Sequence, residues 1–164
     1  MNPGRRCEAK HVTTYLELTD PQDIRPARAV SARFTRVDPP DGAVSRWFYE
    51  RVGADYAWID RLGDDVATWQ AHAERVETWV CETLAGERAG YYELQPGADG
   101  TEIRFFGLLA PFHGRGLGGH MLTVALRRGL ELSDRVWLHT CTLDGPHALS
   151  NYKARGLVPH RERR

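Results

Sequence analysis

A glycine-rich turn between an apolar strand and a helix constrains this chain more than any other feature. The apolar run Phe105–Leu109 leads through Ala-Pro-Phe-His113 into Gly-Arg-Gly-Leu-Gly-Gly119, where a helical pattern begins. Glycine accepts positive φ angles and lets a ligand approach the main chain closely. The start of a helix presents unpaired N–H groups with a partial charge of about +0.5, which favours a phosphate or a diphosphate. We therefore expect an anion site at residues 114–119, where Arg115 adds a mobile cation.

Other phosphate-binding motifs fit this turn less well. Gly114, Gly116 and Gly119 satisfy G-x-G-x-x-G, the dinucleotide fingerprint of nicotinamide-dependent oxidoreductases. That fold needs further β-α-β repeats, whereas few residues follow Gly119 and the upstream pattern is antiparallel. No Gly-Lys-Ser/Thr completes a P-loop. A turn that merely joins a strand to a helix is the remaining alternative, although its glycines would then be an entropic cost without local need.

The hydrophobic pattern predicts a single mixed α/β domain over residues 1–164, since the chain has no internal repeat and no linker. Periodicity and turn residues indicate strands at 13–18, 77–84, 88–94, 101–109 and 135–142, and helices at 43–52, from Asp64 or Asp65 to Val76, at 117–132 and at 146–154. A last strand at 157–163 is left open. The three middle strands are expected to form an antiparallel meander. The strand–helix–strand unit from Thr101 to Thr142 needs a right-handed parallel crossover.

Charge and composition exclude several classes of protein. The 22 basic and 22 acidic residues cancel, which argues against a partner such as nucleic acid or an anionic membrane surface. No 18-residue apolar run is present, and no apolar stretch follows the amino-terminal arginines, so we expect a cytoplasmic protein. The three separated cysteines and seven histidines lack ligand spacing, so neither a metal site nor a disulfide framework is expected.

Three segments carry a resemblance to a known family. The run His113-Gly-Arg-Gly116-Leu-Gly118 resembles motif A of the GNAT superfamily of acyl-CoA-dependent N-acetyltransferases, Arg/Gln-x-x-Gly-x-Gly/Ala. The segment Ala148–Leu157 resembles the family pattern Ala-x-x-x-Tyr-x-x-x-Gly-Phe, and Thr101-Glu-Ile103 resembles the start of the family's fourth strand. The chain departs from the family in having His113 at the first motif position and Gly145 where many members have Asn.

The resemblance implies the GNAT fold, a mostly antiparallel central sheet with one parallel β-α-β crossover and splayed fourth and fifth strands. Little sequence follows Leu157 for the family's last strand. The sheet is therefore expected either to be one strand short or to have its edge covered by a partner subunit, as in a homodimer.

The resemblance also implies that acetyl-CoA is the acyl donor substrate. Residues expected to bind it are Leu108, Leu109, His113, Gly114, Arg115, Gly116, Leu117, Gly118, Gly119 and Asn151. The first two would be main-chain partners of the pantetheine arm. An amide N–H near Leu109 would polarise the thioester carbonyl, in the manner of an oxyanion hole.

Two residues take catalytic roles under the same resemblance. Tyr152 matches the family tyrosine that protonates the leaving thiolate, and Glu102 matches a catalytic glutamate of some histone-acetylating relatives. A base is useful because an alkylammonium with a pKa near 10.4 is protonated at neutral pH. Arg104 and Phe106 are expected on the same strand face as Glu102. Glu93 or water remains the alternative base.

The expected function is direct transfer of an acetyl group to a primary amine of a small molecule or a protein. The alternative is a catalytically idle acyl-CoA-binding module that acts as a sensor or scaffold. The connector Gly53–Arg61 either lines an acceptor pocket or is packed. The acidic residues Asp55, Asp60, Asp64 and Asp65 indicate either a cationic acceptor or helix capping.

Overall fold

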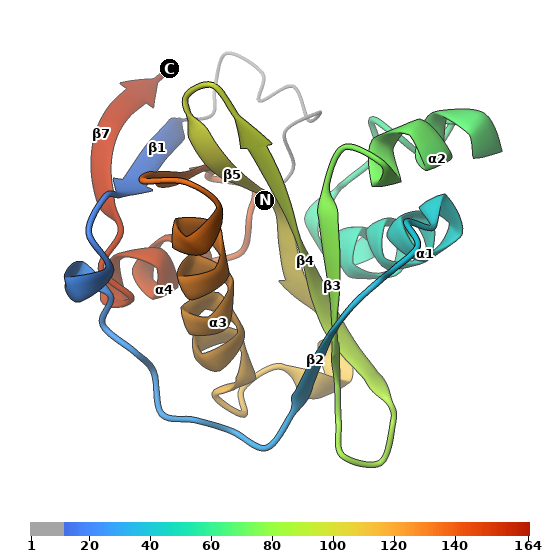
Figure 1. The fold of residues 1–164 in the computed structure, drawn as a ribbon, viewed down its shortest axis with the longest axis horizontal. Coiled ribbons are helices and arrows are strands. Elements are labelled where there is room, and N and C mark those ends of the chain that lie inside the picture. Colours follow the sequence, from blue (N-terminus) through green and yellow to red (C-terminus); the bar gives the residue numbers. More distant parts are fainter. Residues whose placement is uncertain (1–11) are drawn as a thin grey trace.

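The fold is built on a seven-stranded mixed sheet, in a computed structural model that describes residues 12–164 (Figure 1). Its strand order is β2-β3-β4-β5-β6-β1-β7. The strands are β1 (Thr13–Leu18), β2 (Arg33–Arg36), β3 (Glu77–Glu82), β4 (Arg88–Gly97), β5 (Gly100–Leu108), β6 (Val136–Cys141) and β7 (Val158–Arg163). The helices are α1 (Gly42–Gly53), α2 (Val66–Ala73), α3 (Leu117–Leu132) and α4 (Ala148–Ala154). Cys7 and the amino-terminal residues behind the cytoplasmic expectation lie outside the described part.

Helices cover both faces of this sheet, and each face has its own hydrophobic core. Helices α1 and α2 pack on one face over an aromatic cluster that includes Phe48, Tyr91 and Phe105. Helices α3 and α4 lie on the other face, where Met121 and Leu126 of α3 meet Leu138 of β6. The sheet therefore separates the α1 and α2 layer from the α3 and α4 layer. A place where two strands part would connect the two layers.

The sequence pattern predicted most elements correctly. The meander β3-β4-β5 is antiparallel, and α3 has the predicted bounds. Among the described strands, β5 and β6 form the parallel pair, so the glycine fingerprint does not belong to a nicotinamide-binding fold. The short strand β2 was not predicted. Helix α2 ends at Ala73 rather than Val76, and Val66 is 77% exposed rather than core-facing.

The sheet is not one strand short, and the alternative of a last strand at 157–163 is confirmed. Strand β7 is present, and β1 lies between β6 and β7 and is antiparallel to both. Leu16 and Leu18 of β1 are buried in the core beneath α3, which is why the amino-terminal strand occupies this position. The sheet thus needs no strand from a partner subunit, and a homodimer stays a prediction.

The position of β1 forces a long crossing of the α3 face, because β2 lies at the far edge of the sheet. Residues 24–32 make this crossing, and we call them the strap. In Figure 1 the strap passes the amino-terminal end of α3 on its way to β2. Two backbone hydrogen bonds anchor it: the Arg25 N–H donates to the Arg155 carbonyl at 2.9 Å, and the Ala27 N–H donates to Thr123 Oγ1 at 3.0 Å.

Strands β5 and β6 part soon after they meet. They pair at Thr101↔Val136 and Glu102↔Trp137, and beyond these pairs the β6 side of β5 has no strand partner. The resemblance predicted this splay, and the pairing confirms it. A bulge at Arg104 shifts the register between β4 and β5, so Phe106 packs in the α3 core. The expectation that Phe106 shares the face of Glu102 is therefore wrong.

A buried polar network joins α1 and α2 to the sheet. Glu93 of β4 is completely buried and accepts hydrogen bonds from Ser45 at 2.8 Å and Thr78 at 2.6 Å. His72 Nε2 lies 2.9 Å from its other carboxylate oxygen. Burial alone would raise the pKa of Glu93, but these hydrogen bonds and the His72 charge outweigh it and hold the pKa below its ordinary value. The carboxylate is thus ionised and fully engaged.

Substitution Glu93→Ala is expected to cost about 3–5 kcal/mol of unfolding free energy, because it leaves buried donors without an acceptor. The folded-state pKa is lowered, so the wild type holds this stability above the ordinary value of 4.5 and loses it as pH falls. Urea unfolding at neutral and acidic pH measures both effects. The control Glu50→Ala breaks an exposed pair with Arg46 and should cost below about 0.5 kcal/mol. Equal costs for the two variants would contradict the assigned role of the network.

Candidate active site

The glycine-rich turn opens the start of α3. Gly114 and Gly116 have φ angles of +74° and +77°, which favour glycine. Gly116 is the N-cap of α3 and has no side chain to accept a hydrogen bond from the first turn. The first amides of α3 can therefore bind an external acceptor. His113 Nε2 lies 3.0 Å from the Leu108 carbonyl oxygen and holds the turn against the end of β5.

A cavity of about 490 Å³ lies between β5 and α4, and we call it the inner cavity. The predicted site residues that line it are Leu108, His113, Gly114, Gly118, Gly119, Asn151 and Tyr152. Phe106 and the loop at Asp144–Ala148 complete much of its wall. Residues as far apart in the sequence as Tyr56 and Tyr152 are thus brought together at the place where β5 and β6 part.

A second cavity of about 610 Å³, the arginine cavity, adjoins the first. Arg28, Arg115 and Arg155 line it, and no aspartate or glutamate is among its described lining residues. Gly119 and Asn151 line both cavities. A Cβ atom on Gly119 would lie 2.8 Å from Arg155 Nη1 and 2.9 Å from Ala27 Cβ. Glycine at this position therefore lets Arg155 and the strap approach α3.

Beyond Glu102 the edge of β5 that faces β6 is open, and we call the space beside it the gap. The amide of Leu109 does not point into this gap. The Leu109 N–H donates to the Ala89 carbonyl at 2.8 Å, so it points toward β4 and is already engaged. Alternate residues of a strand direct their main-chain groups to opposite edges. The N–H groups of Phe106 and Leu108 therefore face the gap, so the predicted Leu108 stays a candidate donor and Phe106 takes the place of Leu109.

Tyr152 lies deep in the inner cavity. Its ring makes an edge-to-face contact with Phe106, with 6.3 Å between ring centroids. Burial raises the pKa of Tyr152 above its ordinary value, and the nearby Asp144 and Tyr56 raise it further. The phenol is therefore a proton donor near neutral pH and not a phenolate.

Glu102 lies on the other face of the sheet and does not line the inner cavity. Leu138 is buried beneath α3, so its neighbours Trp137 and His139 point to the α1 and α2 side. One Glu102 oxygen lies 3.9 Å from His139 Nε2, and the other lies 3.6 Å from Arg104 Nη1. Burial raises the pKa of Glu102, and Arg104 lowers it by less. The carboxylate thus borders the gap from the face opposite Tyr152.

The remaining sequence-based candidates fall into two groups. Leu117 is buried in the α3 core, which leaves only its main chain for a ligand. Glu93 is fully bonded within its network and reaches neither cavity. Arg28 and Arg155 were not predicted. Arg155 lies within the motif segment 148–157, whereas nothing in the local sequence marks Arg28, because only the path of the strap brings it to the cavity.

The connector Gly53–Arg61 divides between a site and a packed segment. Tyr56 lines the inner cavity, and a Cβ on Gly145 would lie 3.0 Å from its ring. Trp58 is buried in the aromatic cluster beneath α1. Asp64 pairs with Arg61 at 2.8 Å, and Asp65 caps α2 through a bond from the Thr68 N–H. These last two carboxylates are accounted for by local structure.

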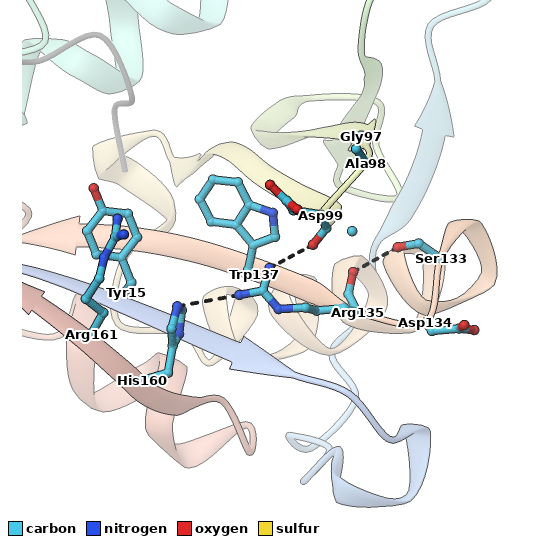
Figure 2. Close-up of a pocket in the computed structure, with 11 residues that line it drawn as sticks. Tyr15, Gly97, Ala98, Asp99, Ser133, Asp134, Arg135, Trp137, His160 and Arg161 are labelled. Atoms are coloured by element: carbon cyan, nitrogen blue, oxygen red, sulfur yellow. Dashed lines mark hydrogen bonds between the residues drawn. The ribbon is translucent and has the colours of Figure 1, made fainter.

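A separate hollow of about 840 Å³ lies at the opposite end of the sheet (Figure 2). Its side chains largely bind one another: Arg135 donates to Glu17 and to the Asp99 carbonyl, and the Arg161 guanidinium lies 4.0 Å from the centre of the Tyr15 ring. None of the predicted site residues lines this hollow. It is therefore distinct from the two adjoining cavities.

Residues 12–164 lack two features that would point to other functions. No cluster of three or more histidine, cysteine, aspartate or glutamate side chains in this range is arranged to hold a metal ion. No helix in the same range combines the length and the apolar character needed to cross a membrane.

The splayed sheet and the glycine-rich helix start agree with the family resemblance of the sequence. The model of the Acetyltransferase (GNAT) family matches residues 38–157, and the chain belongs to this family. The search of curated proteins finds no match.

Solved structures share the fold at low sequence identity. A functionally unknown conserved protein from Staphylococcus epidermidis has a TM-score of 0.65 at 16% identity, over 93% of this chain and 59% of that one. A GCN5-related N-acetyltransferase from Kribbella flavida has a TM-score of 0.65 at 19% identity, over 92% and 55%. Another from Sphaerobacter thermophilus has a TM-score of 0.61 at 18% identity, over 93% and 49%. The chain thus spans roughly half to three-fifths of these proteins.

Proposed function

We propose that this protein is an acetyl-CoA-dependent N-acetyltransferase that moves an acetyl group directly to a primary amine of a small molecule or a protein. The observation that carries the proposal is the pair of adjoining cavities that share Gly119 and Asn151. One cavity lies against an open strand edge and the other is lined by three arginines. Acetyl-CoA has the same order of parts, a neutral pantetheine arm ending in a thioester and an anionic nucleotide. A cytoplasmic location stays a prediction from the sequence.

The donor would lie along the inner cavity with its thioester near Tyr152. Acetyl-CoA supplies an activated acyl group as a thioester. The amides of residues 114–119 and Arg115 would bind its diphosphate at the start of α3. The N–H groups of Phe106 and Leu108 would bind the pantetheine arm and the thioester carbonyl. A donor aimed at developing negative charge on that oxygen is typically worth about 3–4 kcal/mol.

Tyr152 and Glu102 would handle the protons from opposite sides of the gap. Glu102 takes a proton from the acceptor ammonium, directly or through water, which frees the nitrogen lone pair. The nitrogen then bonds to the thioester carbon, and the carbon–sulfur bond breaks as the second nitrogen proton leaves to solvent. Tyr152 gives its proton to the departing sulfur and recovers one from solvent, and Glu102 releases its proton to solvent. The donor thus reaches the gap from the α3 side and the acceptor from the α1 side.

The variant Tyr152→Phe is expected to lower kcat about 10²- to 10⁴-fold, because it removes the proton for the sulfur. The affinity for acetyl-CoA should change little, since the ring still packs on Phe106. Release of free thiol across a panel of primary amines measures the rate, and calorimetry measures binding. A wild type that binds acetyl-CoA yet acetylates no amine would favour the idle sensor or scaffold.

The variant Glu102→Gln tests the base. Glu102 acts as a base only when it is ionised. Because its pKa is raised above the ordinary value of 4.5, the acidic limb of the plot of kcat against pH should lie above pH 4.5. Activity should therefore fall as pH drops through that limb, and the variant should lose both the limb and about 10²- to 10⁴-fold in kcat. Glu50→Gln on the exposed side of α1 is the control and should keep the profile. A Glu102→Gln enzyme that keeps the wild-type rate and limb would assign the base to water.

A further inference from the structure

We propose that the strap, residues 24–32, builds a subsite for the 3′-phosphate of coenzyme A, so that the protein selects 3′-phosphorylated acyl donors. This inference rests on the proposed function and adds a specificity to it. The strap lies outside residues 38–157, the part that matches the family model. The strap therefore adds Arg28 to a cavity whose other arginines, Arg115 and Arg155, lie within the matched part.

The backbone of the strap fixes where Arg28 lies. Hydrogen bonds hold Arg25 to the Arg155 carbonyl and Ala27 to Thr123 Oγ1 of α3. The Thr123 hydroxyl in turn donates to the Gly119 carbonyl at 2.9 Å, within the first turns of α3. The strap is thus fastened to α3 and to the end of α4 beside the arginine cavity. Arg28 follows these anchors directly and enters the wall of that cavity.

The arginine cavity holds more positive charge than a diphosphate needs. The amides of residues 114–119 and Arg115 already provide donors for a diphosphate. Arg28 and Arg155 add two guanidinium groups, and no described lining residue offsets them with a carboxylate. The buried Arg155 Nε has no hydrogen-bond partner among the described residues. Within a chain of zero formal net charge, such a cluster favours a further dianion.

The ligand chemistry that fits is a phosphate monoester next to a diphosphate. A guanidinium fork matches phosphate oxygens in two parallel hydrogen bonds, and the charge on both partners strengthens them. Coenzyme A carries its 3′-phosphate on the ribose that follows the diphosphate. Dephospho-coenzyme A and the phosphopantetheine arm of an acyl carrier protein lack this group. The strap would thus favour free acyl-CoA over both of these donors.

Calorimetric titration of coenzyme A and dephospho-coenzyme A tests the subsite. The wild type is expected to bind coenzyme A about tenfold tighter or more, because charge-assisted hydrogen bonds are lost without the phosphate. Arg28→Gln should remove most of this preference and leave the affinity for dephospho-coenzyme A unchanged. Arg25→Gln on the same strap is the matched control and should keep the preference, since Arg25 lies outside the cavity lining. Thermal melting of each variant checks that the fold is retained.

The outcomes separate this inference from the proposed function. Equal wild-type affinity for the two ligands, or an Arg28→Gln variant that keeps the full preference, would overturn the subsite while leaving the acetyltransferase proposal intact. Failure of both ligands to bind would overturn both. Inorganic phosphate that competes at the subsite should remove the wild type's preference for coenzyme A and leave the affinities of Arg28→Gln unchanged. This result would support a phosphate-monoester site at Arg28.

Discussion

The structure depends on one interruption of hydrogen bonding, the parting of β5 from β6 after two residue pairs. Backbone N–H and C=O groups are normally paired when buried, so an unpaired strand edge beside a cavity is available to a ligand. The parallel pair holds at Glu102 and Trp137, which fixes where the gap begins. The bulge at Arg104 then turns Phe106 toward α3 and leaves Glu102 on the other face. Both sides of the proposed reaction follow from this geometry.

The amino-terminal strand links the fold to the site. Strand β1 lies between β6 and β7, pairs with both, and buries Leu16 and Leu18 in the core. Without β1, β7 would have no strand to join it to β6. It also obliges the following residues to cross the whole α3 face to reach β2. The crossing brings Ala27 and Arg28 to the start of α3. The topology of the sheet thus places a cation beside the proposed diphosphate site.

The sequence predicted what local patterns encode and missed what long-range packing decides. Helix α3 and the glycine turn were readable because apolar periodicity and glycine spacing are local signals. Tyr152 was found through a motif, and its burial in the inner cavity agrees with a proton donor. The position of β1, the engaged Leu109 amide and the role of Arg28 were not readable. Each depends on a residue more than 15 positions away in the sequence. Arg163 of β7 pairs with Thr13 of β1, the Ala89 carbonyl accepts from the Leu109 amide, and Arg155 lines the same cavity as Arg28.

The central claim is that an acyl-CoA lies along the open edge of β5 and over the start of α3. An amide-resolved NMR titration with acetyl-CoA tests it most directly, because it reports on the N–H groups themselves. The account predicts that the largest shifts fall at Phe106, Leu108 and residues 114–119, with little change at residues 97–100. Shifts confined to the hollow around Tyr15 and Trp137, or none at millimolar donor, would contradict it.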